Sequence, residues 1–264
     1  MSINKVQLSM IVLLALSAML AIRPELLHGV DAQTPVLVEL FTSEGCSSCP
    51  PADKLLQRLD RQSIPGQETI VLSEHVDYWN HIGWKDPYSA HFFSERQSAY
   101  AERFGLDGVY TPQMVVDGTS EFVGSDSRLA DKAFKKAVST AKIPVHLSSI
   151  SVDGSHVVHA HLETGLLDSS FGISGAELYV AVALNRAESQ VSAGENSGRR
   201  LAHVSVVRSL TKITYLKQGE DFKKDVQLNL GPESDSRNLR LIAFIQESKQ
   251  GRILGAAAVQ VSPN

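Results

Sequence analysis

The sequence contains only two cysteines in 264 residues, Cys46 and Cys49. Two cysteines cannot form the several disulfides that hold a small secreted scaffold together, so a hydrophobic core has to stabilise the fold. Apolar residues make up 43% of the chain and charged residues 20%, a composition that can build such a core. The length suits one large domain or two ordinary ones.

An excess of positive charge is also missing. The formal net charge is -4, and no basic stripe runs along the sequence. A nucleic-acid partner is therefore not expected. The sequence also lacks a glycine-rich phosphate loop, an HExxH motif and a GxSxG motif, so none of the enzyme classes that these motifs mark is indicated.

Long apolar runs are scarce. The run near the N-terminus, Val6 to Ile22, is short for a membrane span, which needs ~20 residues. Small residues at Val30 and Ala32 predict a signal peptide over residues 1–32 that is cleaved after Ala32, and a retained N-terminal anchor is the alternative. We therefore expect a periplasmic or secreted protein without a membrane span in the mature chain, and an oxidising environment for the cysteines.

The two cysteines lie where a strand pattern gives way to a helix pattern. Pro35 to Phe41 predicts a buried strand, and Pro51 to Leu59 predicts a helix with prolines at its start. A helix N-terminus favours a thiolate, so Cys46 is the expected nucleophile, and Cys49 the thiol that resolves a mixed disulfide. The same spacing also suits a soft metal or a disulfide that never exchanges.

The predicted elements divide the chain near residue 143. Before it, strands and helices alternate in the order β-α-β-α-β-β-α. After it, short apolar or alternating runs recur between turn signals, and no segment has a good helical pattern. The expected strands of this second half are residues 145–152, 156–162, 176–184, 201–216, 225–230, 239–246 and 253–261. We therefore predict one domain over residues 33–142 and a β-sandwich-like domain over residues 143–264.

Three features of the first half resemble the thioredoxin fold. They are the strand, the Cys-Ser-Ser-Cys turn and the helix; then Thr111-Pro112 before a strand; and then the Asp117-Gly118 turn. In thioredoxin-like proteins the proline at this point is cis and packs against the dithiol. The resemblance implies an α/β thioredoxin-like domain followed by an all-β sandwich-like domain. It also implies that Pro112 shapes the site and that Thr111 contacts the substrate.

Longer motifs are similar to an uncharacterised family of secreted bacterial thioredoxin-like proteins. These motifs are Phe41 to Asp53, which includes Gly-Cys-Ser-Ser-Cys-Pro-Pro-Ala-Asp, then His75 to Trp79, Gly83 to Pro87, Tyr110 to Gly118 and Glu195 to His203. The similarity covers nearly the whole mature chain. Because the family is defined by sequence and not by a reaction, it implies fold and export more than an activity.

Two acidic residues and one polar loop have alternative interpretations. Glu39 interrupts the predicted first strand, where a carboxylate suits either proton transfer at the thiols or a structural salt bridge. Glu44 is expected to be a solvated turn residue. The loop Glu195 to His203 is interpreted as a solvated loop before a strand, and the alternative is that it folds back onto the dithiol.

An aromatic stretch follows the second predicted strand. Tyr78, Trp79 and Trp84 fit a substrate groove, or else they cover the edge of the domain. His75 precedes them and is interpreted as a core residue. The alternative is that His75 joins the two cysteines as a ligand of copper or zinc, because thiolates and imidazole suit these metals. No cofactor is expected otherwise.

These residues favour an exported thiol–disulfide oxidoreductase that acts on protein or small-molecule thiols and disulfides. The predicted catalytic residues are Cys46, Cys49, Pro112 and Glu39. Two alternatives stay open. One is a copper metallochaperone that uses Cys46, Cys49 and His75, and the other is a non-catalytic module with a structural disulfide.

Overall fold

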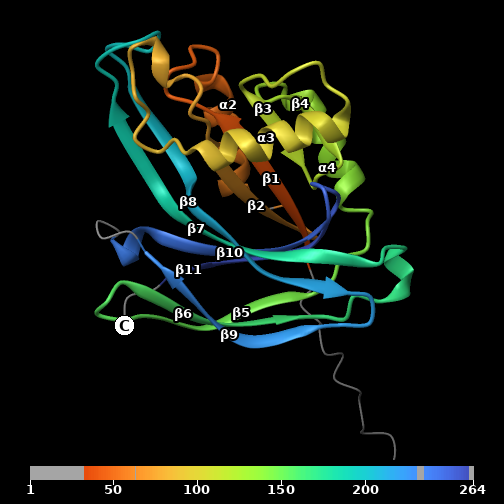
Figure 1. Cartoon of the computed structure of the whole chain (residues 1–264). Coiled ribbons are helices and arrows are strands. Elements are labelled where there is room, and N and C mark those ends of the chain that lie inside the picture. Colours follow the sequence, from red (N-terminus) through yellow and green to blue (C-terminus); the bar gives the residue numbers. More distant parts are fainter. Residues whose placement is uncertain (1–32, 63, 231–234, 262–264) are drawn as a thin grey trace, which may run out of the picture. The chain divides into compact units, whose positions relative to one another are not determined.

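A computed structural model of the chain describes residues 33–62, 64–230 and 235–261 (Figure 1). These residues belong to one compact unit. The predicted signal peptide over residues 1–32 and its cleavage site lie outside the described residues. No helix in the described ranges is both long enough and apolar enough to cross a membrane.

The first elements are β1 (Thr34–Thr42), α2 (Pro50–Arg61) and β2 (Gln67–His75). β1 and β2 pair in parallel, and both are largely buried. Prolines occupy the first helical positions of α2, where an amide would have no partner inside the helix. Leu55 and Leu56 then pack against the sheet, so α2 begins directly after the cysteines and is fixed over β1.

Three more elements complete the first half, with a 3-10 turn (Asn80–Ile82) before them. They are α3 (His91–Phe104), the hairpin of β3 (Gln113–Val116) and β4 (Ser120–Val123), and α4 (Ser127–Ala137). Gly105 ends α3 in the left-handed conformation. Asp117 and Gly118 both have positive φ and form the hairpin turn. The Asp126 carboxylate caps α4 by accepting two amide hydrogen bonds.

The second half consists mainly of strands. They are β5 (Val145–Val152), β6 (Val157–Thr164), β7 (Gly175–Gln190), β8 (Arg200–Lys217), β9 (Phe222–Asn229), β10 (Leu239–Glu247) and β11 (Ile253–Gln260). Short 3-10 turns lie at Ser169–Phe171 and Ser236–Asn238. β7 and β8 form a long antiparallel hairpin whose tip reaches the end of the molecule where α2 and α3 lie (Figure 1).

One large sheet joins the two halves of the chain. Its strand order is β11-β10-β7-β8-β2-β1-β3-β4, and β5-β6-β9 form a separate three-stranded sheet. The junction is the parallel contact of β2 with β8, where Ser73 is paired with Val206. Strands from before and after residue 143 therefore share one hydrogen-bonded sheet.

The core has three parts. One lies between the three-stranded sheet and β7, β10 and β11. A second lies under α2 and α4, and a third lies under α3 on the other face of the large sheet. The third combines Leu37 and Phe41 of β1 with Ala181 of β7 and Ile242 of β10. Apolar burial is thus continuous between the two halves.

The expected architecture of an α/β thioredoxin-like domain followed by an all-β sandwich-like domain is wrong. The described residues form a mostly β structure with eleven strands and three α-helices, and no separate α/β thioredoxin-like domain is present in them. The physical reason is the long β7–β8 hairpin, because it continues the first-half sheet instead of closing a sandwich of its own.

Candidate functional site

Cys46 and Cys49 form a disulfide, with their Cα atoms 5.4 Å apart. This spacing lies in the usual range for a disulfide. Both cysteines are 0% exposed, whereas Ser47 and Ser48 between them are exposed. The ring that the disulfide closes therefore presents two hydroxyl side chains to solvent and keeps its sulfur atoms covered.

The ring is continuous with the first turn of α2. The Cys49 amide donates to the Cys46 carbonyl over 3.2 Å, and the Cys49 carbonyl accepts from the Ala52 amide over 2.9 Å. Cys49 is thus the N-cap residue of α2, one residue before the helix begins. The disulfide lies at the positive end of the helix dipole, where a thiolate is favoured over a thiol.

Ser48 connects the ring to the segment of Thr111 and Pro112. The Ser48 hydroxyl lies 3.3 Å from the Cys46 sulfur and 3.5 Å from the Thr111 carbonyl oxygen. The Thr111–Pro112 peptide bond is cis, and Pro112 is buried. The structure thus brings Thr111 and Pro112 to the ring, although their role in catalysis stays a prediction.

The predicted aromatic residues lie beside the ring and are hydrogen-bonded to protein groups. The Trp79 indole N–H donates to the Thr111 hydroxyl over 2.7 Å, and the Trp84 indole N–H donates to the Glu44 carboxylate over 2.8 Å. The Tyr78 hydroxyl donates to Gln97 over 3.1 Å, and burial raises the pKa of Tyr78 to about 12. All three rings are partly exposed, and substrate binding by them stays a prediction.

Glu44 is not the solvated turn residue that the sequence indicated, because it is fully buried. Its amide donates to the Asp86 carboxylate over 2.8 Å, and one of its own carboxylate oxygens lies 3.3 Å from His203 Nε2. Glu44 is buried because two later segments of the chain, the aromatic segment and β8, both cover the turn before Cys46.

His203, on β8, is 3% exposed. Its Nδ1 lies 3.6 Å from the Asp53 carboxylate in the first turn of α2, on the side opposite to its contact with Glu44. Burial lowers the pKa of His203, but the charges and hydrogen bonds of Asp53 and Glu44 outweigh it and raise the pKa to about 10. His203 is therefore a buried cation between two carboxylates at neutral pH.

His75 lies next to His203, and their ring centroids are 4.7 Å apart. His75 Nδ1 is hydrogen-bonded to Asp86 over 2.7 Å, and His75 is 0% exposed. Burial raises the pKa of Asp86, but His75 and the amides of Glu44 and Tyr88 outweigh it and lower the pKa to about 2. No three His, Cys, Asp or Glu side chains of the described chain are grouped as metal ligands. The copper alternative therefore stays a prediction.

The loop between β7 and β8 folds onto the ring, contrary to the solvated loop that we favoured from the sequence. The side-chain amide of Asn196 donates to the carbonyl oxygens of Glu44 and Cys46, over 2.8 and 2.9 Å. The Ser47 amide donates to the Glu195 carboxylate over 3.0 Å, and this contact lowers the pKa of Glu195. The second half of the chain thus supplies part of the site.

Glu39 takes part in an ion pair on the α3 face of the sheet. One carboxylate oxygen accepts from Arg96 over 2.6 Å, and the other accepts from the Tyr100 hydroxyl over 2.5 Å. Glu74 is also buried there, and burial and the charge of Glu39 raise its pKa well above the usual value. These contacts fit the structural interpretation of Glu39, while proton transfer to the thiols stays a prediction.

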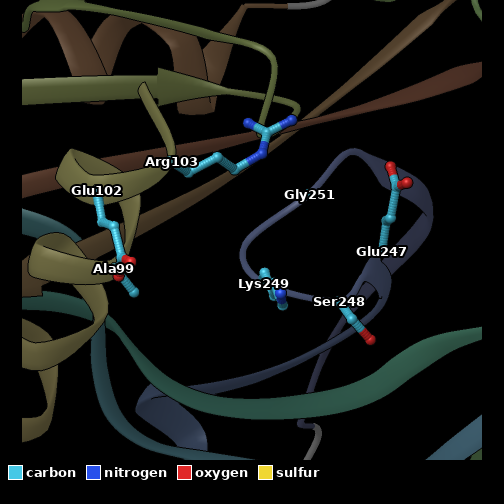
Figure 2. A pocket seen from close by; sticks show the side chains of 7 residues that line it. All are labelled: Ala99, Glu102, Arg103, Glu247, Ser248, Lys249 and Gly251. Atoms are coloured by element: carbon cyan, nitrogen blue, oxygen red, sulfur yellow. The ribbon is translucent and has the colours of Figure 1, made fainter. Parts of the chain in front are cut away.

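A pocket of about 630 Å³ lies apart from these residues, between α3 and the β10–β11 turn (Figure 2). It is lined by Ala99, Glu102, Arg103, Glu247, Ser248, Lys249 and Gly251. Acidic and basic side chains alternate around it, and none of the predicted site residues lines it. The pocket is therefore not part of the candidate site, and its mixed charges do not indicate the charge of a ligand.

Sequence reasoning did not assign a role to Asp53, Asp86, Asn196 or His203. Each of them falls inside one of the motif segments that carry the family resemblance, although only the cysteines there have chemistry that can be recognised from spacing. The recurrence of acidic residues and histidines in these segments was the available signal. What was missing was the pairing of β2 with β8, which brings the segments together.

The structure is similar to two solved proteins. For protein AGR_C_4864 from Agrobacterium tumefaciens, the identity is 26% and the TM-score 0.66, over 87% of this chain and 95% of that chain. For HBP35 of Porphyromonas gingivalis, the values are 16% and 0.62, over 88% of this chain and 77% of that chain, so this similarity concerns the fold alone.

No curated protein matches the sequence. The predicted membership of an uncharacterised family is confirmed, although its thioredoxin-like fold is not. The family model described as "Protein of unknown function (DUF1223)" matches residues 37–246, and the chain therefore belongs to the DUF1223 family.

Proposed function

We propose that this protein is an exported thiol–disulfide oxidoreductase whose reacting pair is Cys46 and Cys49. The observation that supports it best is the position of the pair. The only two cysteines of the chain are joined across two exposed serines, directly before a helix whose N-terminus favours thiolate. A disulfide that serves only stability requires neither exposed residues between its cysteines nor a position at a helix N-terminus.

The reaction is an exchange of two electrons and two protons. A thiolate of a protein or small-molecule partner attacks the Cys46 sulfur and forms a mixed disulfide, and Cys49 leaves as a thiolate that takes up a proton. A second partner thiolate then attacks the partner's sulfur and releases the Cys46 thiolate. The partner's two thiols are oxidised to a disulfide, and the protein disulfide is reduced to two thiols; reduction of a partner disulfide is the reverse.

The surroundings assign different roles to the two sulfurs. Cys46 lies against the exposed hydroxyl of Ser48, which can donate to a thiolate and can be reached from solvent. Cys49 is the N-cap of α2 and directly precedes the first residue of the helix. This arrangement favours Cys46 as the attacked sulfur and nucleophile. Because both sulfurs are covered, a partner has to displace neighbouring groups before it reacts.

A turbidity assay of insulin reduction by dithiothreitol tests the proposal. We expect the protein to accelerate insulin reduction, and the Cys46→Ala variant to be inactive. Cys49→Ala is the matched control, because it should trap a mixed disulfide through Cys46 instead of turning over. Equal activity of Cys46→Ala and the wild type would exclude the proposed chemistry.

One observation favours a second candidate, a non-catalytic module with a structural disulfide. Both cysteines are 0% exposed, as expected for a disulfide that only closes a turn. In that case the wild type would not accelerate insulin reduction. Its disulfide would also resist dithiothreitol until the protein unfolds, and the same samples can measure this by alkylation of free thiols.

A further inference from the structure

Two carboxylates lie on either side of the disulfide ring in sequence and meet the same histidine. Glu44 comes two residues before Cys46, and Asp53 comes four residues after Cys49. His203 Nε2 lies 3.3 Å from the Glu44 carboxylate, and His203 Nδ1 lies 3.6 Å from the Asp53 carboxylate. The imidazole therefore bridges the segment that enters the ring and the helix that leaves it.

The bridge is electrostatic. All three side chains are at least 94% buried, and the facing atoms of Glu44 and His203 have no hydrogen-bond partner in the described structure, so charge attraction is what joins them. Buried carboxylates need a counter-charge, and His203 is the cation placed between them. Two further rings face His203 edge-on, that of His75 at 4.7 Å and that of Tyr88 at 6.1 Å between centroids, and Asp86 holds His75.

His203 is held in place independently of the ring. It lies in β8, where it is paired with Ala187 of β7, and β8 contacts β2 three residues further on. The bridging side chain thus projects from a long hairpin that is stabilised along its whole length. Reduction of the disulfide removes the covalent link between Cys46 and Cys49 but leaves this support unchanged.

We propose that His203 is a positioning residue of the dithiol, which holds Glu44 and Asp53 together and thereby keeps the two flanks of the reduced ring at the spacing from which the disulfide closes. The inference rests on the proposed function, because it concerns the same exchange. Without the cation, the buried carboxylates on its two sides lose their common counter-charge, and the repulsion between them, no longer offset, moves the flanks apart. The effective concentration of one thiol at the other then falls, and closure of the ring becomes less favourable.

The test is the equilibrium of the folded protein with glutathione redox buffers, with the oxidised fraction counted after alkylation. We expect His203→Gln to lower the equilibrium constant for ring closure about tenfold, within the usual range of coupling between contacting residues. The double variant Glu44→Gln/His203→Gln also removes one of the two buried carboxylates, and should recover to within about threefold of the wild type. His146→Gln, at an exposed histidine of β5, is the matched control and should equal the wild type.

Several results would overturn the inference. They are a His203→Gln equilibrium within twofold of the wild type, a shift toward easier ring closure, or no recovery in the double variant. If His203→Gln does not fold, Glu44→Gln alone decides, because glutamine keeps an acceptor for Trp84 and loses only the bridge. It should lower the constant about threefold, and no change would overturn the proposal.

Failure of this inference differs from failure of the proposed function. If the wild-type disulfide exchanges with glutathione in the folded state and the His203 variants behave like it, only the positioning role is lost. If the wild-type disulfide does not exchange in the folded state, the proposed function is wrong, and the positioning role is wrong with it.

Discussion

Asn196 and Cys46 are 150 residues apart in the sequence, yet the Asn196 side-chain amide donates a hydrogen bond of 2.9 Å to the Cys46 carbonyl oxygen. The same amide donates to the Glu44 carbonyl over 2.8 Å, and Asn196 is fully buried. The tip of the β7–β8 hairpin therefore satisfies backbone groups of the disulfide ring. Without the second half of the chain, the Glu44 carbonyl would lack a donor, and the Cys46 carbonyl would keep only the Cys49 amide.

Asn196→Ala should destabilise the protein and make the disulfide more reactive. The substitution leaves the buried Glu44 carbonyl without a donor and leaves the Cys46 carbonyl with the Cys49 amide alone, and a buried group left without a partner costs about 1–3 kcal/mol. We expect a loss of roughly 1–3 kcal/mol in the free energy of urea unfolding, and faster reduction of the native protein by dithiothreitol. Ser197→Ala is the control, because its exposed hydroxyl bonds only the Ser192 carbonyl within the same loop. Equal stability of the two variants would contradict the role of Asn196.

Ser48→Ala should raise the pKa of the Cys46 thiol in the reduced protein. The Ser48 hydroxyl lies 3.3 Å from the Cys46 sulfur, and a hydrogen bond to a thiolate favours the charged form. The ultraviolet absorbance of the thiolate, followed against pH, measures this pKa. Ser47→Ala is the neighbouring control, since the contact that Ser47 makes is with Glu195. If both variants titrate like the wild type, Ser48 does not stabilise the thiolate.

The stability of the folded protein should fall in alkaline solution because of His203. Its pKa is about 10, above the ordinary value of 6.5, so its contribution is complete below about pH 6.5 and is lost as the pH rises through about 10. The difference in unfolding free energy between the wild type and His203→Gln should therefore shrink from neutral pH to about pH 10. Urea unfolding of both proteins across this range measures the difference. A difference that stays constant would show that His203 is not a cation in the folded state.

The contribution of Asp86 to the stability of the folded protein should have the opposite pH dependence and be lost in acidic solution. Its pKa falls from 3.8 to about 2, so its contribution is present above about pH 4 and is lost as the pH falls through about 2. We expect Asp86→Asn to cost about 2 kcal/mol near pH 6 and much less near pH 2. Urea unfolding at both pH values measures the two costs. A cost that is unchanged in acid would mean that Asp86 does not stabilise the fold through its charge.

Arg96→Leu should strongly destabilise the protein without involving the disulfide. Arg96 is the cation that neutralises the buried Glu39 and lies 3.6 Å from the buried Glu74. Removing one partner of a buried ion pair costs about 3–5 kcal/mol. Arg58→Leu, at an exposed position of α2, is the control and should stay within about 0.5 kcal/mol of the wild type. Similar unfolding midpoints for the two variants would contradict the structural role of this pair.

Glu39→Gln separates the two interpretations of Glu39. If the carboxylate only neutralises Arg96, the variant loses stability and exchanges its disulfide at the wild-type rate. If Glu39 transfers a proton to or from the thiols, exchange slows, by about 10²–10⁴-fold for a typical general acid or base. The contacts with Arg96 and Tyr100 occupy both carboxylate oxygens, so we expect the first result. Stopped-flow reduction by dithiothreitol gives the rate.

The individual strands, helices and turns were largely predictable from the sequence, because each depends on residues that are close together in the chain. The apolar run before Cys46, the prolines that open α2, and the Asp117-Gly118 turn each have a physical reason that involves only near neighbours. The strand at Gln113–Val116 has the predicted ends. The strands of the second half also lie close to their predicted positions.

The arrangement of the strands was not predictable in the same way. The contact of Ser73 with Val206 joins residues more than a hundred positions apart, and strand periodicity does not specify a partner. A thioredoxin-like domain was inferred from the order of local elements, and this order is compatible with more than one sheet. The burial of Glu44 and Asn196 depends on that same long-range pairing, which explains why both were taken for solvated residues.

The reduction potential of the Cys46–Cys49 disulfide in the folded protein is the most direct measurement. The protein is equilibrated with glutathione buffers of graded composition, its thiols are alkylated and counted, and circular dichroism checks that the fold persists. We expect reversible two-electron exchange with a potential above about -300 mV, where labile and catalytic disulfides lie. A potential well below about -300 mV, with reduction only after unfolding, would contradict thiol–disulfide exchange as the function of this ring.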